Sequence, residues 1–228
     1  MFESSHDAPG AAGTRTRPAR RSTTTKWGDR EQRRADILDA ARTHIATAGY
    51  LSLNMRDLAA NAGVSPGTLY SYFATKEELF ATLYAEAIRG YTESLREAFA
   101  TATGLEAVLV TLIEHHLELY RHYGRFFTTW SAMRHDTDAT DAPFPKELII
   151  ELRDATLEGN RLQMQTIRAA AQSDGTRIVD ERMVPAFLWT SLSGIADHLT
   201  SERSALDPFP PEELIAFAAR RLALAITQ

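Results

Sequence analysis

Several side chains between residues 54 and 76 are of the types that contact the phosphates and base edges of a nucleic acid. Tyr, Ser, Thr and Asn side chains donate hydrogen bonds to phosphate oxygens, as do free N–H groups at the start of a helix. Thr68 and Tyr70 also offer a methyl group and a ring to thymine. Residues 65–72 contain no Arg or Asn for a bidentate base contact, so we expect modest sequence readout. Side chains of these types are those of Asn54, Arg56, Ser65, Thr68, Tyr70, Ser71, Tyr72 and Lys76.

Two short helices are predicted to position these residues. Asn54 can cap a helix that ends near Asn61, and Gly63 allows the sharp turn that follows because glycine adopts positive φ freely. Ser65 can cap the next helix, with Pro66 at its first position. A helix-turn-helix would place the second of these helices in the major groove. An ordinary corner between two helices of a bundle has the same spacing, and spacing alone leaves both readings open.

A longer helix is predicted on each side of this pair. In the upstream helix, Asp29 suits the N-cap and Gly49 suits the end. Apolar residues recur between them every three to four positions, which places them on one face. Downstream, Thr75 and Glu78 have the spacing of a capping box.

The residue identities in this segment are a more specific signal of function than the spacing of its caps and turn. The runs Ala48-Gly49-Tyr50, Met55-Arg56-Asp57-Leu58-Ala59, Ala62 to Phe73 and Lys76 to Phe80 together resemble the DNA-binding domain of the TetR (tetracycline-repressor) family. The resemblance covers residues 29–80. It implies a homodimeric transcription repressor that binds a palindromic operator and is released by a small apolar ligand. It also implies a DNA-binding domain at 29–75 and an effector-binding and dimerisation domain at 76–228.

The resemblance assigns phosphate contacts to Asn54, Arg56 and Lys76. It also implies a set of DNA-binding candidates that face the groove: Ser65, Pro66, Gly67, Thr68, Tyr70, Ser71 and Tyr72. Pro66 departs from the family pattern, since Lys or Arg is frequent there, and Ser71 departs where His is common. Phosphate contacts are therefore better supported than base contacts. We interpret Phe73 as a core residue and Tyr70 as an exposed one.

A basic segment precedes the first helix. Residues 11–34 hold eight Lys or Arg against two acidic residues, whereas the whole chain has a net charge of −5. Residues 1–28 have almost no large apolar side chains and are predicted to be a disordered arm. The arm, with Arg30 and Arg34, could reach DNA beside the operator, as arms of other helix-turn-helix proteins do. A solvated tail without a partner has the same composition.

The rest of the chain is predicted to be helical, which gives an all-α protein of about nine helices. One helix should begin with a cap at Thr103 and stop at Gly124, and a short aromatic helix should follow it. Further helices are expected at 146–172, at 184–201 and from Pro211 onward.

Two sets of apolar residues in this part are candidates for binding. The dimer candidates follow the last two helices: Leu188, Ser191, Leu192, Ile195, Leu199, Phe217 and Leu222. The ligand candidates are mostly aromatic: His116, Tyr120, Phe127, Trp130, Met133, Met164 and Trp189, with Asn160 as a polar partner. Either set could instead be buried inside one chain, because periodicity does not separate these cases.

Other classes of protein find little support in the sequence. Motifs for nucleotide binding, serine hydrolysis and zinc proteolysis are absent, so we expect neither an enzyme nor a cofactor or metal site. The chain has no cysteine and no apolar run long enough for a membrane span, which predicts a cytoplasmic protein. A helical interaction module that binds no DNA remains the alternative to a regulator.

Overall fold

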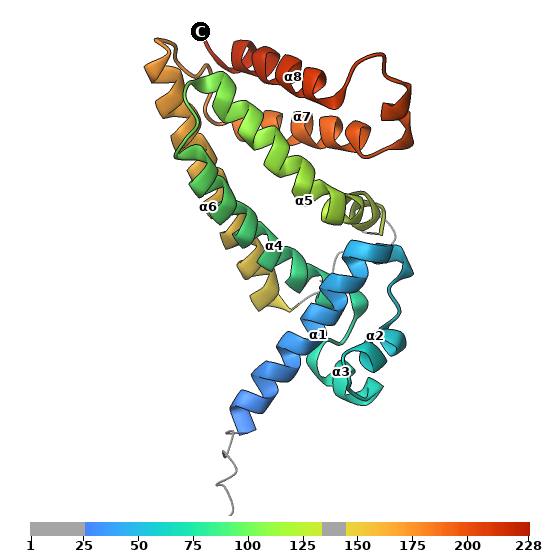
Figure 1. Ribbon diagram of the computed structural model, residues 1–228. Helices are drawn as coiled ribbons and strands as arrows, with labels where there is room; N and C mark the ends of the chain where they lie inside the picture. The colour runs from blue at the N-terminus through green and yellow to red at the C-terminus, as the bar shows by residue number, and fades with distance from the viewer. Residues whose placement is uncertain (1–25, 134–144) are drawn as a thin grey trace, which may run out of the picture.

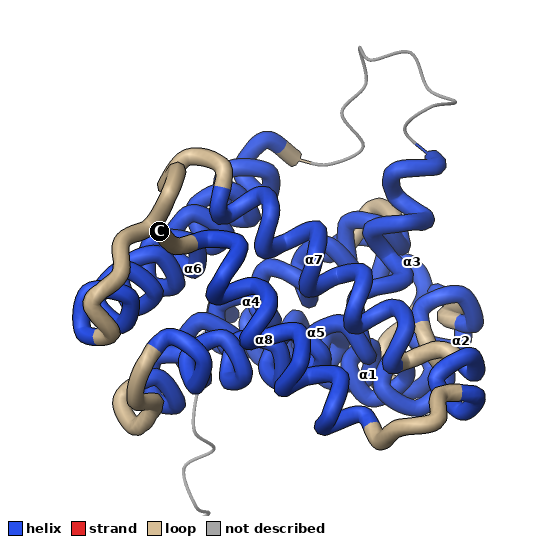
Figure 2. Tube along the Cα trace, turned by 90° about the horizontal axis from the view of Figure 1, so that it is seen from above, coloured by secondary structure: helices blue, strands red, loops and turns tan. Residues whose placement is uncertain are grey.

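The structure, a computed structural model, describes residues 26–133 and 145–228, and the side chains within 30–124 and 145–228. Regular structure in these ranges is helical (Figure 2), as predicted. The elements are α1 (Lys26–Ala48), η1 (Tyr50–Ser52), α2 (Met55–Asn61), α3 (Pro66–Tyr72), α4 (Lys76–Phe99), α5 (Leu105–Met133), α6 (Lys146–Ser173), α7 (Val184–Leu199), η2 (Glu202–Leu206) and α8 (Pro211–Ile226). No helix in the described ranges is both long and apolar enough to cross a bilayer.

The molecule has two ends, which are joined by the long helices α4, α5 and α6 (Figure 1). The small helices α2 and α3 lie with α1 at one end, and α7 and α8 lie side by side at the other. Helices α4 and α6 pack against each other, and α5 contacts this pair as well as α7 and α8. Helix α4 therefore runs continuously from the small end into the larger body.

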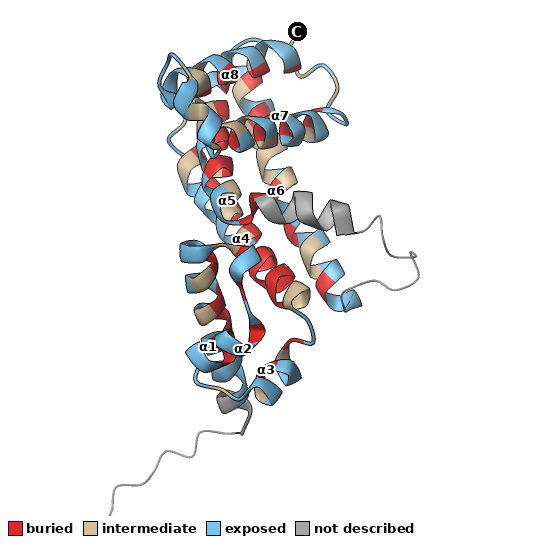
Figure 3. Cartoon of the chain, turned by 90° about the vertical axis from the view of Figure 1, so that its right-hand side faces the viewer, coloured by how far each residue is buried: buried red, intermediate tan, exposed pale blue. Residues whose placement is uncertain are grey.

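Each end has its own apolar core (Figure 3). In the first core, Leu58, Leu69 and Phe73 pack with Phe80 of α4, and Val64 packs against them from the turn. The second core joins α5 to α7 and α8. Leu69 and Phe73 are 0% and 2% exposed, and the burial of Phe73 confirms its interpretation as a core residue.

Helix α5 corrects the predicted number of helices. It passes through Gly124 and ends at Met133, so the described ranges contain eight α-helices rather than nine. Gly124 is buried, and a Cβ there would overlap the ring of Tyr120, one turn earlier. The glycine makes room for that ring within a continuous helix, which is why it does not act as a stop.

The starts of two helices also differ from the prediction. Helix α1 begins at Lys26, so Asp29 lies inside it rather than capping it. At α5, the first ladder bond runs from Val108 N–H to the carbonyl of Gly104, so Thr103 is not the cap. The Leu105 N–H instead donates to Asp174 Oδ2 at 2.7 Å, from the residue that follows α6.

The last residues of the chain pair with the connection between α6 and α7. Ile178 and Thr227 form an isolated antiparallel bridge. Arg177 and Gln228 exchange two backbone hydrogen bonds, of 3.1 and 2.9 Å. These bonds fix the end of α8 against the body.

Candidate DNA interface and ligand cavity

The helix-turn-helix is built by three side-chain caps. Asn54 Oδ1 accepts from Arg56 N–H at 2.8 Å, and Ser65 Oγ accepts from Thr68 N–H at 3.0 Å. Gly63 has φ of 66°, which confirms the left-handed turn expected between α2 and α3. Thr75 Oγ1 accepts from Glu78 N–H at 3.0 Å, and the Glu78 carboxylate accepts from Ala74 N–H at 2.8 Å. Seven-residue helices are marginal alone, so the caps and the core together hold α3 in place.

The outward side of α3 carries most of the predicted DNA-binding residues. Tyr70 is 48% exposed, which confirms it as a surface residue. The Ser71 hydroxyl donates to the Thr68 carbonyl at 2.6 Å, so its proton is already used within the helix. Thr68 and Tyr72 are partly buried, and the other candidates on α2 and α3 are exposed: Asn54, Arg56, Ser65, Pro66, Gly67 and Ser71.

Helix α1 brings positive charge beside α3. The Arg30 guanidinium lies 5.7 Å from the centre of the Tyr72 ring, and that of Arg34 lies 5.4 Å from the Phe73 ring. Arg34 is also 3.9 Å from Glu86 of α4, which leaves Arg30 as the freer cation. Arg33 is exposed, and no carboxylate among the described residues lies within ion-pair distance of it. Arg33 lies in the basic segment of the sequence and was not among the predicted DNA contacts.

Lys76 lies at the start of α4, where it also contacts η1. Its Nζ is 4.3 Å from the centre of the Tyr50 ring and 3.4 Å from the Leu51 carbonyl oxygen. Burial lowers the pKa of Lys76, and the nearby Glu77 carboxylate opposes that shift. The ammonium is thus partly buried, and its contact with phosphate stays a prediction.

A cavity of about 760 Å³ lies between α4, α6 and α7. This volume falls within the range of sites that hold drug-sized molecules. Its walls are mostly apolar or aromatic, and the charged residues among them are arginines. The lining residues include Tyr84, Ile88, Tyr91, Leu152, Leu157, Pro185, Ala186 and Trp189, with the polar Thr92, Thr156, Asn160, Gln163 and Thr190 and the charged Arg153 and Arg182.

The cavity agrees with the predicted ligand residues only in part. Trp189 and Asn160 line it, and Met164 lines a smaller cavity of about 260 Å³. His116 and Tyr120 do not line either of these cavities, which corrects their assignment. The side chains of Phe127, Trp130 and Met133 lie outside the described residues. The prediction did not include the cavity wall that α4 forms. Tyr84, Ile88 and Tyr91 line this wall, and their helical spacing in the sequence could have indicated it.

His116 lies behind the cavity wall. It is 2% exposed, and its ring meets that of Trp189 edge to face at 5.1 Å. Its Nε2 is 3.4 Å from the Ser193 hydroxyl. Burial lowers the pKa of His116 from 6.5 to about 4, so the neutral imidazole supports Trp189 at neutral pH.

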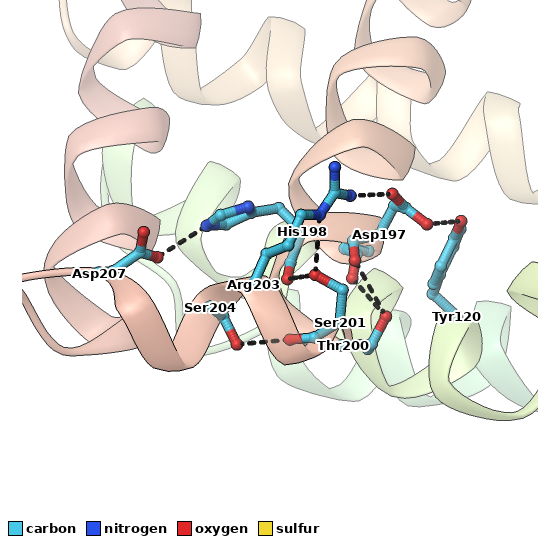
Figure 4. A network of polar contacts seen from close by, with 9 residues as sticks. Tyr120, Asp197, His198, Thr200, Ser201, Arg203, Ser204 and Asp207 are labelled. Atoms are coloured by element: carbon cyan, nitrogen blue, oxygen red, sulfur yellow. Dashed lines mark hydrogen bonds and ion pairs between the residues drawn. The ribbon is translucent and has the colours of Figure 1, made fainter.

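Tyr120 belongs to a polar network at the end of α7 (Figure 4). Its hydroxyl donates to Asp197 Oδ1 at 3.3 Å, and Arg203 Nη2 donates to Asp197 Oδ2 at 3.1 Å. Nearby, His198 Nε2 lies 2.7 Å from Asp207 Oδ2. These contacts join α5 to the α7–α8 connection, which gives Tyr120 a structural role away from the cavity.

The predicted dimer residues divide between the inside and the outside of the chain. Leu188, Leu192 and Leu222 are at most 7% exposed within the second core, so they are unavailable to a partner and the prediction is wrong for them. Ser191, Ile195 and Leu199 are partly buried. Phe217 is 50% exposed, as is expected of an interface residue. Phe187 and Leu224 are 43% and 67% exposed and were not among the predicted dimer residues.

The described part of the chain contains no candidate metal site. No group of three or more His, Cys, Asp or Glu side chains there could hold a metal ion.

The fold thus joins a helix-turn-helix DNA-binding domain to a helical body with a cavity. Residues 37–83 match the family model described as "Bacterial regulatory proteins, tetR family". Residues 37–83 therefore carry a DNA-binding segment similar to that of the tetR family of regulators. This confirms the resemblance found in the sequence.

Three similar proteins are regulators by name. The chain is 32% identical over 83 residues to the fatty acid metabolism regulator protein of Bacillus subtilis (strain 168), covering 36% of this chain and 43% of the relative. It is 26% identical over 153 residues to the transcriptional activator FasR of Mycolicibacterium smegmatis, covering 63% and 70%. It is 34% identical over 85 residues to the transcriptional repressor KstR2 of Rhodococcus jostii, covering 36% and 40%. The chain thus spans less than half the length of two of these relatives.

Solved structures of similar fold extend over most of the chain. FadR from Bacillus subtilis in complex with stearoyl-CoA has a TM-score of 0.58 at 19% identity, covering 84% of this chain and 98% of that one. A tetR-family regulatory protein from Rhodococcus RHA1 has a TM-score of 0.59 at 17% identity, covering 86% and 97%. At these identities the likeness concerns the fold alone.

Proposed function

We propose that this regulator is a repressor that binds a palindromic operator as a homodimer and leaves it when a small apolar ligand enters the cavity. The exposed side of α3, with Tyr70 outward and Arg30 beside it, carries the DNA-binding part of the proposal. In this proposal residues 29–75 bind DNA, and residues 76–228 bind the effector and dimerise.

Helix α4 is the proposed link between ligand and DNA. Phe80 and Tyr84 pack in the first core, and Tyr84, Ile88 and Tyr91 line the cavity. Ion pairs hold α4 to its neighbours, from Arg42 of α1 to Glu86 and from Arg89 to Glu151 of α6. A ligand that moves α4 would therefore move the helix-turn-helix with it.

The names of similar proteins guide the choice of ligand. One relative is named a regulator of fatty acid metabolism, and one solved structure is named as a complex with stearoyl-CoA. The cavity walls are mostly apolar, which suits an acyl chain. We therefore propose acyl compounds as effectors. KstR2 is named a repressor and FasR an activator, so the direction of control needs its own test.

DNase footprinting and gel shifts on the DNA upstream of the protein's own gene test the function. We expect protection of a palindromic site without ligand and loss of protection with an acyl compound. In a transcription assay on the same DNA, the ligand-free protein should lower transcript yield. Absence of sequence-specific protection at any salt concentration would refute DNA regulation, and a rise in transcript would refute repression.

A substitution at Gly159 tests the proposed link through α4. A Cβ at Gly159 would lie 3.0 Å from Thr92 Oγ1, so Gly159→Ala should push α6 away from α4 at the cavity. We expect weaker operator binding in the absence of any ligand. Gly90→Ala on α4 is the matched control, because a Cβ there meets nothing within 4 Å. Equal operator affinity of the two variants would contradict the link.

The proposed dimer face lies on the outer sides of α7 and α8. Phe187 and Gly194 lie on α7, and Phe217 and Leu224 lie on α8 with Arg221 over the Phe217 ring. Leu224→Glu should give a monomer in sedimentation experiments and weaken operator binding. A variant that stays dimeric would place the interface elsewhere.

The basic arm is proposed to contact DNA beside the operator. Four arginines lie within residues 1–25, and Arg30 places the start of α1 next to α3. Removing residues 1–25 should lower operator affinity and reduce the slope of log K against log salt by about 0.9 for each lost phosphate contact. An unchanged slope would show that the arm does not bind DNA.

A further inference from the structure

The two cavities of the body are neighbours along α6. Leu157 and Asn160 line both the larger cavity and the smaller one. The larger cavity has mostly apolar walls from α4, α6 and α7. The smaller is lined by Arg161, Met164 and Arg168 and by Glu181 from the α6–α7 connection. A ligand that fills the larger cavity and passes Asn160 would therefore meet a polar, charged surface.

The charges around the two cavities are mainly positive. Four arginines line them, whereas Glu181 is the single carboxylate among the lining residues. Glu181 is already engaged, since Arg168 donates to its two oxygens at 2.7 and 2.5 Å. The remaining three cations are Arg153, Arg161 and Arg182, and no negative group of the lining opposes them.

These three arginines differ in their partners. Arg153 pairs with the adjacent Asp154 at 3.0 Å, and Arg182 with Asp180 at 3.1 Å. Both pairs are exposed, where water weakens such interactions and partners exchange easily. Arg161 is exposed and has no carboxylate within ion-pair distance among the described residues. An anion at this place would gain a guanidinium partner without being buried.

We propose that the effector is an amphipathic anion, with its apolar chain in the larger cavity and its anionic head group where the two cavities adjoin, at Arg182 of the larger and Arg161 of the smaller. This inference rests on the proposed role of the cavity as the effector site. The apolar walls favour the chain, and the arginine fork matches a carboxylate or a phosphate. The head group stays at the exposed rim, so it avoids the large cost of burying a charge. A cationic amphiphile would meet repulsion at the same place.

Binding of four probes with the same chain length tests the inference. The probes are decanoate, the decanoyl thioester of coenzyme A, decanol and decyltrimethylammonium, each below its micelle concentration. Affinity is measured on the full chain by tryptophan fluorescence, since Trp189 lines the cavity, and by thermal shift. We expect one or both anions to bind at least tenfold more tightly than decanol, and the cation to bind more weakly than decanol.

Charge variants locate the head group. Arg161→Gln and Arg182→Gln should each weaken binding of the preferred anion by about tenfold and leave decanol binding unchanged. Arg177→Gln is the matched control, because Arg177 is exposed and lines neither cavity. Equal losses in all three variants would indicate a general charge effect and refute the site.

The outcomes separate this inference from the function it rests on. Ala186→Phe adds a ring to the wall of the larger cavity at an exposed position of α7 and should abolish binding of every probe. If it does so but the anions bind no better than decanol, the head-group site is wrong and the effector cavity stands. If Ala186→Phe leaves all binding unchanged, the cavity is not the effector site. A preference for the thioester assigns a phosphorylated head group, and a preference for decanoate assigns a free carboxylate.

Discussion

The helix-turn-helix and the body hold their helices in place in different ways. Helices α2, α3 and α4 begin with the side-chain caps Asn54, Ser65 and Thr75, each bonded to its own helix. The N-cap residues of α6, α7 and α8 are Pro145, Met183 and Pro210, and none of them makes a side-chain cap bond. The seven-residue helices α2 and α3 depend on such local bonds, whereas the longer helices, including the capped α4, are held mainly by packing along their length.

The two sites differ in the same way. The proposed DNA contacts lie on consecutive turns of one helix and its neighbour, so residues close in sequence form the surface. The cavity takes its walls from α4, α6 and α7, and Tyr84 and Trp189 are over a hundred positions apart in the sequence. The first site depends on local structure, and the second depends on how distant helices cross.

Loss of a core side chain at the helix-turn-helix should have the largest effect on this comparison. Leu69 is 0% exposed, so Leu69→Ala is expected to cost about 2–5 kcal/mol of unfolding free energy in that part of the chain. Operator binding should fall while the tryptophan response to ligands persists, as measured by gel shift and fluorescence at the same temperature. Simultaneous loss of both would show that the two regions do not behave separately.

Acid should destabilise the body through His116. Because burial lowers its pKa from 6.5 to about 4, the unfolded chain binds a proton more readily than the folded one. Stability present above pH 6.5 is therefore lost as pH falls toward 4, by about 3 kcal/mol from this group. Urea unfolding between pH 7 and pH 4 should show this loss of unfolding free energy. The variant His116→Phe should reduce the slope of unfolding free energy against pH. An unchanged slope in His116→Phe would contradict the assignment.

A single hydroxyl at the DNA surface should have a smaller effect. Tyr70→Phe keeps the exposed ring and removes the hydrogen bond proposed to phosphate, which should weaken operator binding about tenfold, or about 1.4 kcal/mol. Ser71→Ala should change affinity less than Tyr70→Phe, since the Ser71 proton is already donated to the Thr68 carbonyl. Fluorescence anisotropy with labelled operator measures both, and a larger loss for Ser71→Ala would reverse this ranking.

The smallest expected effect compares a local cap with a position that is not a cap. Asn54→Ala removes the acceptor for Arg56 N–H and should cost about 1 kcal/mol. Thr103→Ala should change stability by less than about 0.5 kcal/mol, because α5 begins with an N–H that donates to Asp174 instead. Equal costs in urea unfolding would show that side-chain caps do not distinguish the two regions.

The same contrast explains what the sequence could predict. The bounds of α2 and α3 follow from Asn54, Gly63, Ser65 and Pro66, because caps and turns act between near neighbours. The continuity of α5 through Gly124 depends on where the Tyr120 ring lies, and a glycine in isolation indicates a stop.

The binding residues of the body were harder to predict for a related reason. Leu188 and Leu192 form an apolar stripe that suits an interface and a core equally well. Helix α5 covers that stripe, and a pattern within one helix does not reveal its neighbour. His116 likewise lies one ring away from the cavity, behind Trp189.

Tyr84 lines the cavity and also packs in the core of the DNA-binding end. A substitution at Tyr84 that changes ligand preference would therefore also disturb operator binding. Substitutions in this wall of the cavity should for that reason be rarely retained. Leu157 and Ala186 line the cavity without belonging to either core. Divergence of ligand specificity among descendants of this protein should accordingly accumulate on the α6 and α7 walls, while the α4 wall changes slowly.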